Sequence, residues 1–169
     1  MVVDVSADTA ALVQGIAQLL GASGQCLVCA ESCTGGLIAA ACTALAGSSH
    51  WFDRGFVTYS NEAKTEMLGV DARLIERVGA VSEDVARAMA QGALQRAPRA
   101  DWAIAVTGIA GPGGGTAAKP VGTVWFAWAD RRGAVQTQCH HFDGDRAAVR
   151  AQTCDTALRE LLGWLRADA

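Results

Sequence analysis

The chain has 169 residues, enough for one domain that closes a hydrophobic core. Its net charge is −3 and its acidic and basic residues are interspersed, which argues against direct contact with nucleic acid. No apolar run approaches the ~18 residues that span a bilayer, and the first ten residues lack the pattern of a signal peptide. We therefore expect a cytoplasmic protein with no membrane partner.

Helices and strands are expected to alternate in the first half of the chain, because apolar residues recur there at helical spacing or in short runs. The leading helix shows this spacing from Leu12 to Leu20, with Asp8 as its candidate N-cap and its end near residues 21–24. The elements predicted after it are a strand at 26–30, an alanine-rich helix at 34–45, a strand at 55–60 and a short helix at 62–68.

The second half is expected to continue with helices and a hairpin. A short helix at 71–78 precedes a longer one capped by Ser82, whose first turn carries Glu83 and Asp84. The remaining predicted elements are a strand at 101–107, a glycine-rich loop at 108–120, strands at 121–129 and 135–142, and a final helix from Asp145. This order predicts an α/β fold: a three-layer α/β/α sandwich with a mixed five-stranded sheet, as a single domain over residues 1–169.

Six cysteines raise the question of a metal site. Cys26 and Cys29 have zinc-ligand spacing, but they lie in an expected buried strand. His140 and His141 lie in another strand, where neighbours point to opposite faces. Reduced, buried cysteines suit a cytosolic chain better, so we expect no metal and no cofactor.

The first candidate for chemistry is the loop at residues 30–36, where a strand runs into a helix. Open α/β sheets place their ligands in such loops. Ser32 would sit beside the helix N-terminus, where unpaired amides from Thr34, Gly35 and Gly36 can hold an oxyanion or a phosphate. The alternative is that Ser32 or Thr34 only caps the helix.

The second candidate is the stretch that holds Tyr59, the single tyrosine, and Lys64, one of two lysines in a chain otherwise rich in arginine. Lys64 falls in the first turn of its expected helix, where the dipole disfavours an ammonium and lowers the pKa of the amine, as a general base requires. A serine–lysine pair is one known way to activate a serine nucleophile. The alternative is an exposed lysine near Glu62, with Tyr59 as an ordinary strand residue.

The third candidate is the glycine-rich segment 107–115, which leads to residues 119–123. Runs of glycine after a strand can form amide concavities that bind anions. No helix is expected to follow, so the segment matches neither the Walker pattern nor the dinucleotide fingerprint. A flexible lid is the alternative.

Five motifs, in order, resemble the CinA C-terminal domain family. They are Ala-Glu-Ser-Cys-Thr-Gly-Gly at 30–36, Val-Thr-Tyr-Ser-Asn-Glu-Ala-Lys at 57–64, Gly-Ala-Val-Ser at 79–82, Thr-Gly-Ile-Ala-Gly-Pro at 107–112 and Lys-Pro-Val-Gly-Thr-Val at 119–124. The resemblance runs from about residue 10 to the final helix and is to the form that stands alone, without the N-terminal domain of full-length CinA proteins. It implies a three-layer α/β/α fold and a nicotinamide-nucleotide amidase, which hydrolyses nicotinamide mononucleotide to nicotinic acid mononucleotide and ammonia.

The resemblance also implies roles for individual residues. Ser32, Tyr59 and Lys64 match the family's serine, tyrosine and lysine. Ser32 would form an acyl-enzyme, while Lys64 moves the proton directly or through the Tyr59 hydroxyl. Amides near Gly35 and Gly36 are expected to hold the oxyanion. The resemblance does not assign the ribose and phosphate sites; from the glycine-rich loop itself we infer Thr107, Gly108, Gly111, Gly114 and Lys119 as candidates. The expected partner is a small pyridine nucleotide, and the resemblance implies a homo-oligomer.

Two alternatives stay open at this point. Cys33 adjoins Ser32 at the same helix end and could be the nucleophile, although a cysteine hydrolase usually needs a histidine. The chain has only His50, His140 and His141, none in a strong motif. The chain could also be a non-catalytic, nucleotide- or partner-binding regulatory module of the competence/damage-inducible type.

Overall fold

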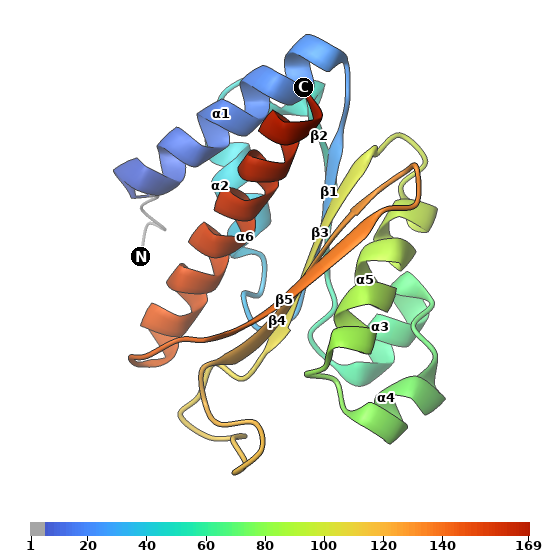
Figure 1. Ribbon diagram of the computed structural model, residues 1–169, viewed down its shortest axis with the longest axis vertical. Helices are drawn as coiled ribbons and strands as arrows, with labels where there is room; N and C mark the ends of the chain where they lie inside the picture. The colour runs from blue at the N-terminus through green and yellow to red at the C-terminus, as the bar shows by residue number, and fades with distance from the viewer. Residues whose placement is uncertain (1–5) are drawn as a thin grey trace.

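Five strands form one mixed sheet with helices on both faces (Figure 1). The computed structural model describes residues 6–169, so residues 1–5 of the expected domain lie outside the described part. Its elements are α1 (Ala7–Ser23), β1 (Leu27–Glu31), α2 (Leu37–Ala44), η1 (Ser48–His50), β2 (Phe52–Val57), α3 (Asn61–Leu68), α4 (Ala72–Val78), α5 (Glu83–Arg96), β3 (Trp102–Gly108), β4 (Thr123–Asp130), β5 (Val135–His141) and α6 (Arg146–Asp168).

The strand order across the sheet is β2-β1-β3-β4-β5. β1 pairs in parallel with β2 and β3, whereas β4 is antiparallel to both β3 and β5. Helices α1, α2 and α6 cover one face of the sheet, and α3, α4 and α5 lie on the other (Figure 1). The predicted three-layer α/β/α sandwich is therefore confirmed. Within residues 6–169, no helix combines the length and the apolar composition that crossing a membrane requires.

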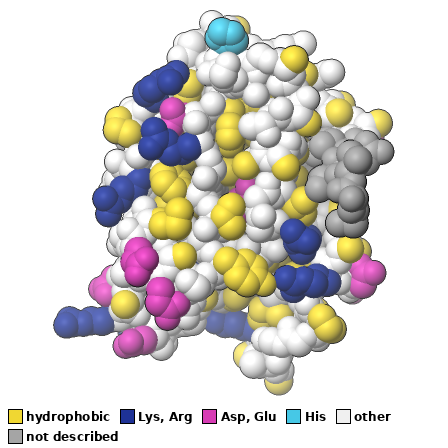
Figure 2. All heavy atoms as spheres, turned by 180° about the vertical axis from the view of Figure 1, so that it is seen from behind, with side chains coloured by type: hydrophobic (Ala, Val, Ile, Leu, Met, Phe, Trp, Pro, Cys, Tyr) yellow, Lys and Arg dark blue, Asp and Glu magenta, His cyan; other side chains and the backbone are white. Residues whose placement is uncertain are grey.

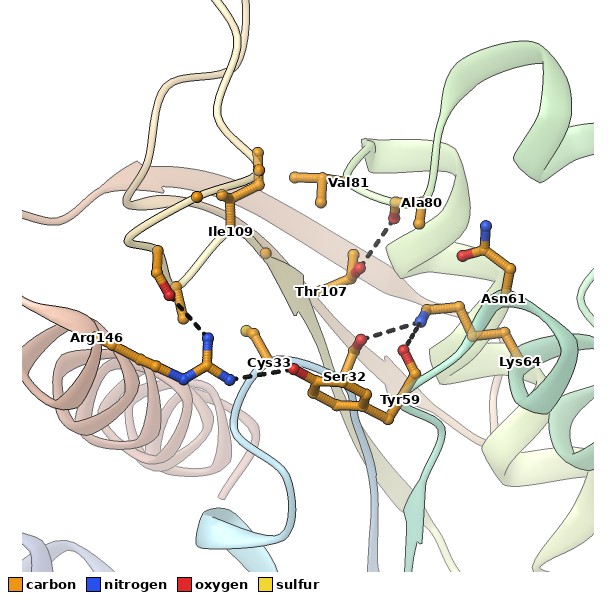
Figure 3. A pocket seen from close by; sticks show the side chains of 15 residues that line it. Ser32, Cys33, Tyr59, Asn61, Lys64, Ala80, Val81, Thr107, Ile109 and Arg146 are labelled. Atoms are coloured by element: carbon orange, nitrogen blue, oxygen red, sulfur yellow. Dashed lines mark hydrogen bonds between the residues drawn. The ribbon is translucent and has the colours of Figure 1, made fainter.

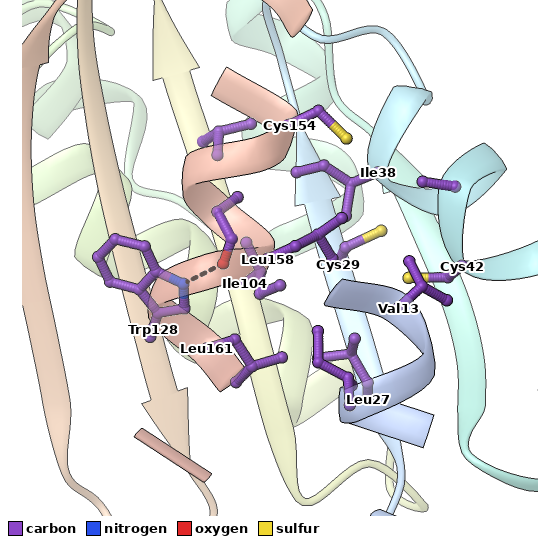
Figure 4. Close-up of a cluster of buried hydrophobic side chains, with 14 of the residues drawn as sticks. Val13, Leu27, Cys29, Ile38, Cys42, Ile104, Trp128, Cys154, Leu158 and Leu161 are labelled. Carbon is purple, nitrogen blue, oxygen red and sulfur yellow. Dashed lines mark hydrogen bonds between the residues drawn. The ribbon is translucent and has the colours of Figure 1, made fainter. Parts of the chain in front are cut away.

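The two faces of the sheet carry side chains of different size. Toward α1, α2 and α6, strand β4 presents Phe126 and Trp128, and the Trp128 indole donates a hydrogen bond of 2.9 Å to the Ala157 carbonyl of α6 (Figure 4). Toward α5, four buried positions of β3 and β4 are alanines, Ala103, Ala105, Ala127 and Ala129, and the larger Trp125 is only partly buried there. Small side chains on this face let α5 pack closely against the sheet.

Helix α1 is capped by Ser6 rather than by the expected Asp8. Ser6 Oγ accepts a hydrogen bond of 3.1 Å from the Thr9 N–H, and Asp8 lies inside the first turn, where its charge suits the helix dipole. The cap therefore lies two residues earlier than the apolar spacing indicated.

Helix α2 begins at Leu37, three residues later than expected. Gly35 and Gly36 adopt left-handed φ angles of 57° and 102°, which an α-helix cannot contain. Residues 32–36 form a tight turn between β1 and α2 instead, and this turn shapes the candidate site.

Candidate active site

A serine and a lysine meet beyond the carboxyl ends of two parallel strands. Ser32 directly follows β1, and Lys64 lies in α3, which follows the neighbouring strand β2. A hydrogen bond of 3.0 Å joins Lys64 Nζ and Ser32 Oγ (Figure 3). Both side chains are buried, with Lys64 1% exposed and Ser32 7% exposed. The alternative of a solvent-exposed Lys64 is therefore wrong.

Alternation along β1 explains why Ser32 faces α3. Val28 and Ala30 pack in the hydrophobic layer of α5, on the side of the sheet where α3 lies. Ser32 continues this series, and its N–H donates to the Val106 carbonyl of β3 at 3.1 Å. The strand geometry thus extends one residue beyond β1 and directs the hydroxyl toward Lys64.

Backbone carbonyls surround the Lys64 amine. Nζ donates to the Thr58 carbonyl at 2.9 Å and lies 3.3 Å from the Tyr59 carbonyl and 3.4 Å from the Ser60 carbonyl. A carbonyl oxygen can only accept a hydrogen bond. A neutral amine would therefore donate its two N–H groups to carbonyls and present its lone pair to the Ser32 hydroxyl.

Burial lowers the pKa of the Lys64 amine below its ordinary value of 10.5, while Cys33 and Glu62 act in the opposite direction. Loss of hydration disfavours the ammonium, so the buried site favours the form that can accept a proton. The direction agrees with the one expected from the first turn of the helix, although the main cause is burial.

A pocket of about 300 Å³ opens beside this pair (Figure 3). Thr107 lies next to Ser32 in the extension of the β1–β3 register, and its hydroxyl donates to the Ala80 carbonyl at 2.9 Å. Other expected site residues that line the pocket are Tyr59, Gly108, Gly111 and Gly114. All three loops singled out in the sequence therefore contribute to one pocket.

Tyr59 stands at the exposed side of the pocket. Its side chain is 61% exposed, and its hydroxyl accepts a hydrogen bond of 3.1 Å from Arg146 Nη2 (Figure 3). Its contact with Lys64 is through the backbone carbonyl. The direct contact between Lys64 and Ser32 is thus the shorter path for a proton in this arrangement.

Arg146 is a pocket residue that sequence reasoning missed. It is the first residue of α6, and its Nη1 donates to the Gly111 carbonyl at 2.9 Å. Arginine keeps its positive charge at all physiological pH values, so Arg146 brings a fixed cation to the pocket. The chain is rich in arginine and Arg146 lies outside the five motifs, so nothing in the sequence distinguished it.

The turn after Ser32 is arranged differently from the expectation. The Glu31 carboxylate is fully buried and accepts hydrogen bonds from the Thr34 hydroxyl at 2.6 Å and the Gly36 N–H at 3.1 Å. The Gly35 N–H donates to the Ser32 carbonyl at 3.1 Å. Thr34, Gly35 and Gly36 are not among the residues that line the pocket, and the expected oxyanion donors Gly35 and Gly36 are engaged within the turn.

Lys119, the expected charge partner of a phosphate, binds the protein instead. Its Nζ donates to the Val78 carbonyl at the end of α4 at 3.0 Å, and the residue is not among those that line the pocket. Within residues 6–169, the cationic side chains of the pocket lining are Lys64 and Arg146.

Cys33 lines the pocket, but its thiol is a poor candidate nucleophile. Burial raises the pKa of Cys33 to about 11, so the thiol keeps its proton at neutral pH, whereas the thiolate is the nucleophilic form. Across the described part of the chain, the pocket lining contains none of His50, His140 and His141. A cysteine nucleophile would therefore have no histidine base at this site.

Known proteins match this chain over most of its length. The model of the CinA C-terminal domain family matches residues 9–165. The chain belongs to this family. A relative from Enterobacter agglomerans, named nicotinamide-nucleotide amidohydrolase PncC, is 58% identical over 151 residues, which cover 87% of this chain and 92% of the relative. A relative of the same name from Escherichia coli (strain K12) is 54% identical over 150 residues, covering 89% of this chain and 90% of the relative.

Solved structures of CinA superfamily proteins share the fold. The crystal structure of a competence/damage inducible protein from Agrobacterium tumefaciens matches with a TM-score of 0.93 at 47% sequence identity. The match covers 98% of this chain and 99% of that chain. The CinA-type sandwich is thus common to nearly the whole length of both proteins.

Proposed function

We propose that this chain is a nicotinamide-nucleotide amidase that converts nicotinamide mononucleotide to nicotinic acid mononucleotide and ammonia. The observation that carries the proposal is the buried contact of 3.0 Å between Lys64 Nζ and Ser32 Oγ, at the wall of a pocket of about 300 Å³. The names of two relatives that are more than half identical support the substrate. The serine–lysine pair supports hydrolysis through an acyl-enzyme.

Acylation begins when Ser32 Oγ attacks the carboxamide carbon. Lys64 Nζ takes the hydroxyl proton as the C–O bond forms, and the carbonyl oxygen becomes an oxyanion. The C–N bond then breaks, and Lys64 passes the proton to the leaving nitrogen, which departs as ammonia. An ester of Ser32 remains.

Deacylation repeats these steps with water in place of the serine hydroxyl. Lys64 takes a proton from the attacking water, the bond between the ester carbon and Ser32 Oγ breaks, and the proton returns to Ser32 Oγ. The product leaves as a carboxylic acid, which loses its proton to the solvent at neutral pH. Each turnover therefore consumes one water and restores both side chains.

The nucleotide's ribose and phosphate are proposed to occupy the rest of the pocket, between the loop after β3 and the start of α6. Gly108, Gly111 and Gly114 line this part, where the absence of side chains lets a ligand approach the backbone. Arg146 takes the role first expected of Lys119, because its guanidinium lines the pocket and can bind a phosphate through two parallel N–H groups.

Ammonia release from nicotinamide mononucleotide, measured with a chelator present, tests the proposal. We expect wild type to be active and both Ser32→Ala and Lys64→Met to lose roughly 10⁴-fold or more in kcat, as removal of a nucleophile or its base typically costs. Cys33→Ala is the matched control at the adjacent position and is expected to keep its activity.

Two other outcomes would support a different mechanism or a different function for this protein. Activity that survives in Ser32→Ala and disappears in Cys33→Ala would identify Cys33 as the nucleophile. A wild-type protein that binds the mononucleotide tightly and releases no ammonia would establish the regulatory binding module instead.

A further inference from the structure

The four amides that follow Ser32 divide into two groups. The Gly35 and Gly36 N–H groups are engaged, one with the Ser32 carbonyl and the other with the carboxylate at the start of the turn. The Cys33 and Thr34 N–H groups have no hydrogen-bond acceptor in another residue within residues 6–169. Both residues are buried, at 5% and 0% exposure. Buried amides without an acceptor are rare, because each one costs about as much free energy as a lost hydrogen bond.

The direction of these two N–H groups is fixed, because the carbonyl of each one's peptide unit accepts a hydrogen bond. A peptide unit is planar and trans, so its C=O and its N–H point in opposite directions. The Cys33 N–H shares its unit with the Ser32 carbonyl, which accepts from the Gly35 N–H. The Thr34 N–H shares its unit with the Cys33 carbonyl, which accepts a hydrogen bond of 3.1 Å from Arg150 Nε. Both free donors therefore point away from the groups that hold the turn.

Arg150 reaches the turn from α6 and binds two consecutive carbonyls. Its Nε donates to the Cys33 carbonyl, and its Nη2 donates to the Thr34 carbonyl at 2.8 Å. The guanidinium is a planar fork with donors at fixed separation, so it holds the two peptide units in one relative orientation. One side chain from a distant part of the sequence thus sets the geometry on both sides of Thr34.

The buried Glu31 carboxylate fixes the other end of the turn. It accepts from the Ile38 and Ala39 amides at 3.0 and 2.9 Å, in addition to the Gly36 amide and the Thr34 hydroxyl. The N–H groups at the start of α2, which have no partner within the helix, therefore donate to this carboxylate. Of the amides from Cys33 to Ala39, only those of Cys33 and Thr34 have no hydrogen-bond acceptor in the part of the chain that the structure describes. These two directly follow the candidate nucleophile.

We propose that the Cys33 amide is the oxyanion donor of the amidase reaction and that Arg150, which holds the turn on the far side of Cys33, is the positioning residue that aims it. This inference rests on the proposed function. A carboxamide whose carbon is in reach of Ser32 Oγ would place its oxygen against the amide that directly follows Ser32, that of Cys33. Cys33 lines the pocket beside Ser32, as this arrangement requires. Preorganised donors of this kind stabilise the charge that develops in the transition state.

Arg150→Met tests the role of the guanidinium, because it keeps an extended side chain and removes both hydrogen bonds. We expect kcat to fall roughly 10- to 100-fold with little change in KM, less than the roughly 10²- to 10³-fold typical for deleting a donor itself. Arg159→Met, on the exposed side of the same helix, is the matched control and should leave both constants unchanged. The kcat of Arg150→Lys should lie between those of Arg150→Met and Arg159→Met, since an ammonium keeps the charge but lacks the planar fork of the guanidinium.

A second readout separates oxyanion stabilisation from a general loosening of the turn. The aldehyde analogue of nicotinamide mononucleotide adds to Ser32 Oγ: the serine proton passes to Lys64 and the aldehyde oxygen becomes the oxyanion. In Arg150→Met its inhibition constant should rise by about the factor by which kcat/KM falls. The inhibition constant of nicotinic acid mononucleotide, which forms no tetrahedral adduct, should stay unchanged.

Full activity in a folded Arg150→Met variant, or equal weakening of the aldehyde and the acid, would overturn the inference and leave the proposed function standing. A wild-type protein that releases no ammonia would reject the proposed function itself. Circular dichroism and urea unfolding check that each variant is folded. If Arg150→Met does not fold, Arg150→Lys carries both readouts, with activity equal to wild type as the contradicting result.

Discussion

Lys64 is a buried amine in a cage of oxygen atoms, and two effects compete to set its charge. The carbonyls of Thr58 and Tyr59 accept hydrogen bonds from either form, and a third N–H of an ammonium would point at Ser32 Oγ. Burial disfavours the ammonium. The pKa of the amine is lowered in the folded protein, so burial outweighs the stabilisation that the surrounding oxygen atoms give the ammonium. The proposed base is therefore made by removing water from a lysine rather than by a neighbouring cation.

The pH dependence of both activity and stability should report this amine. We expect kcat/KM to rise with pH along a limb that ends below 10.5, where an ordinary lysine titrates. Between the lowered folded-state pKa and 10.5 the unfolded chain binds more protons, so the free energy of unfolding should also rise with pH in that window. A pH–rate profile and urea unfolding at matched pH values measure the two. The same stability slope in Lys64→Met would contradict the assignment.

Tyr59→Phe distinguishes a direct proton path from a relay. The substitution removes the hydroxyl that accepts from Arg146 but keeps the backbone carbonyl that faces Lys64. We expect kcat close to wild type and KM raised by at most about fivefold, the effect of losing one hydrogen bond worth about 1 kcal/mol. Steady-state kinetics measure both constants. A fall in kcat of about 100-fold or more would show that the phenol carries the proton.

Sequence motifs predicted that Ser32 and Lys64 share a site, and the structure brings them together, whereas the groups that orient them were not predictable. Arg146 and Arg150 lie on α6, whose apolar spacing indicates which side is buried but not which residues reach the turn after β1. Glu31 lies inside the first motif, yet its role depends on a turn conformation that two left-handed glycines impose. These contacts arise from the packing of α6 and from backbone angles, neither of which is visible in residue spacing.

At the scale of elements, the position of α3 matters most, because this helix carries Lys64. It has only eight residues and could not be stable alone. Its end packs directly against α5: a Cβ on Gly92 would collide with the Leu68 carbonyl. Gly92 therefore allows the close approach that sets α3 on the sheet.

Gly92→Ala should destabilise the protein, although helix propensity alone favours alanine by about 1 kcal/mol. The new methyl group must push α3 away, and such overpacking typically costs about 1–3 kcal/mol. We also expect a lower kcat, because Lys64 moves with α3. Urea unfolding and ammonia release measure the two effects.

Gly163→Ala in α6 is the matched control, since open space surrounds its Cβ position. It should gain about 0.5–1 kcal/mol from helix propensity and leave kcat unchanged. Equal stabilisation by both substitutions would show that α3 yields to the added methyl group.

At the scale of the whole molecule, the order of strand and helix patterns was enough to predict the three-layer sandwich, because alternating elements leave few ways to pack. The pattern could not give the order of strands in the sheet, since it does not say which strands are neighbours. That order decides the site: β2, β1 and β3 lie side by side, so the loops that follow them share one pocket.

The homo-oligomer implied by the family resemblance stays a prediction. Figure 2 shows hydrophobic side chains gathered in the middle of one face, with charged side chains toward its margins. Val57, the last residue of the edge strand β2, and Tyr59, which lines the pocket, are among the exposed large hydrophobic residues.

The hydrogen bond between Ser32 and Lys64 spans 32 residues and exists only when β1 lies beside β2 and α3 is docked on α5. Helices can form in about a microsecond, whereas a contact of this kind must wait until the loop between its partners has closed. A refolding chain would therefore regain most of its helical signal before it regains a nucleophile. The time at which ammonia release returns during refolding would then report when the parallel strands pair.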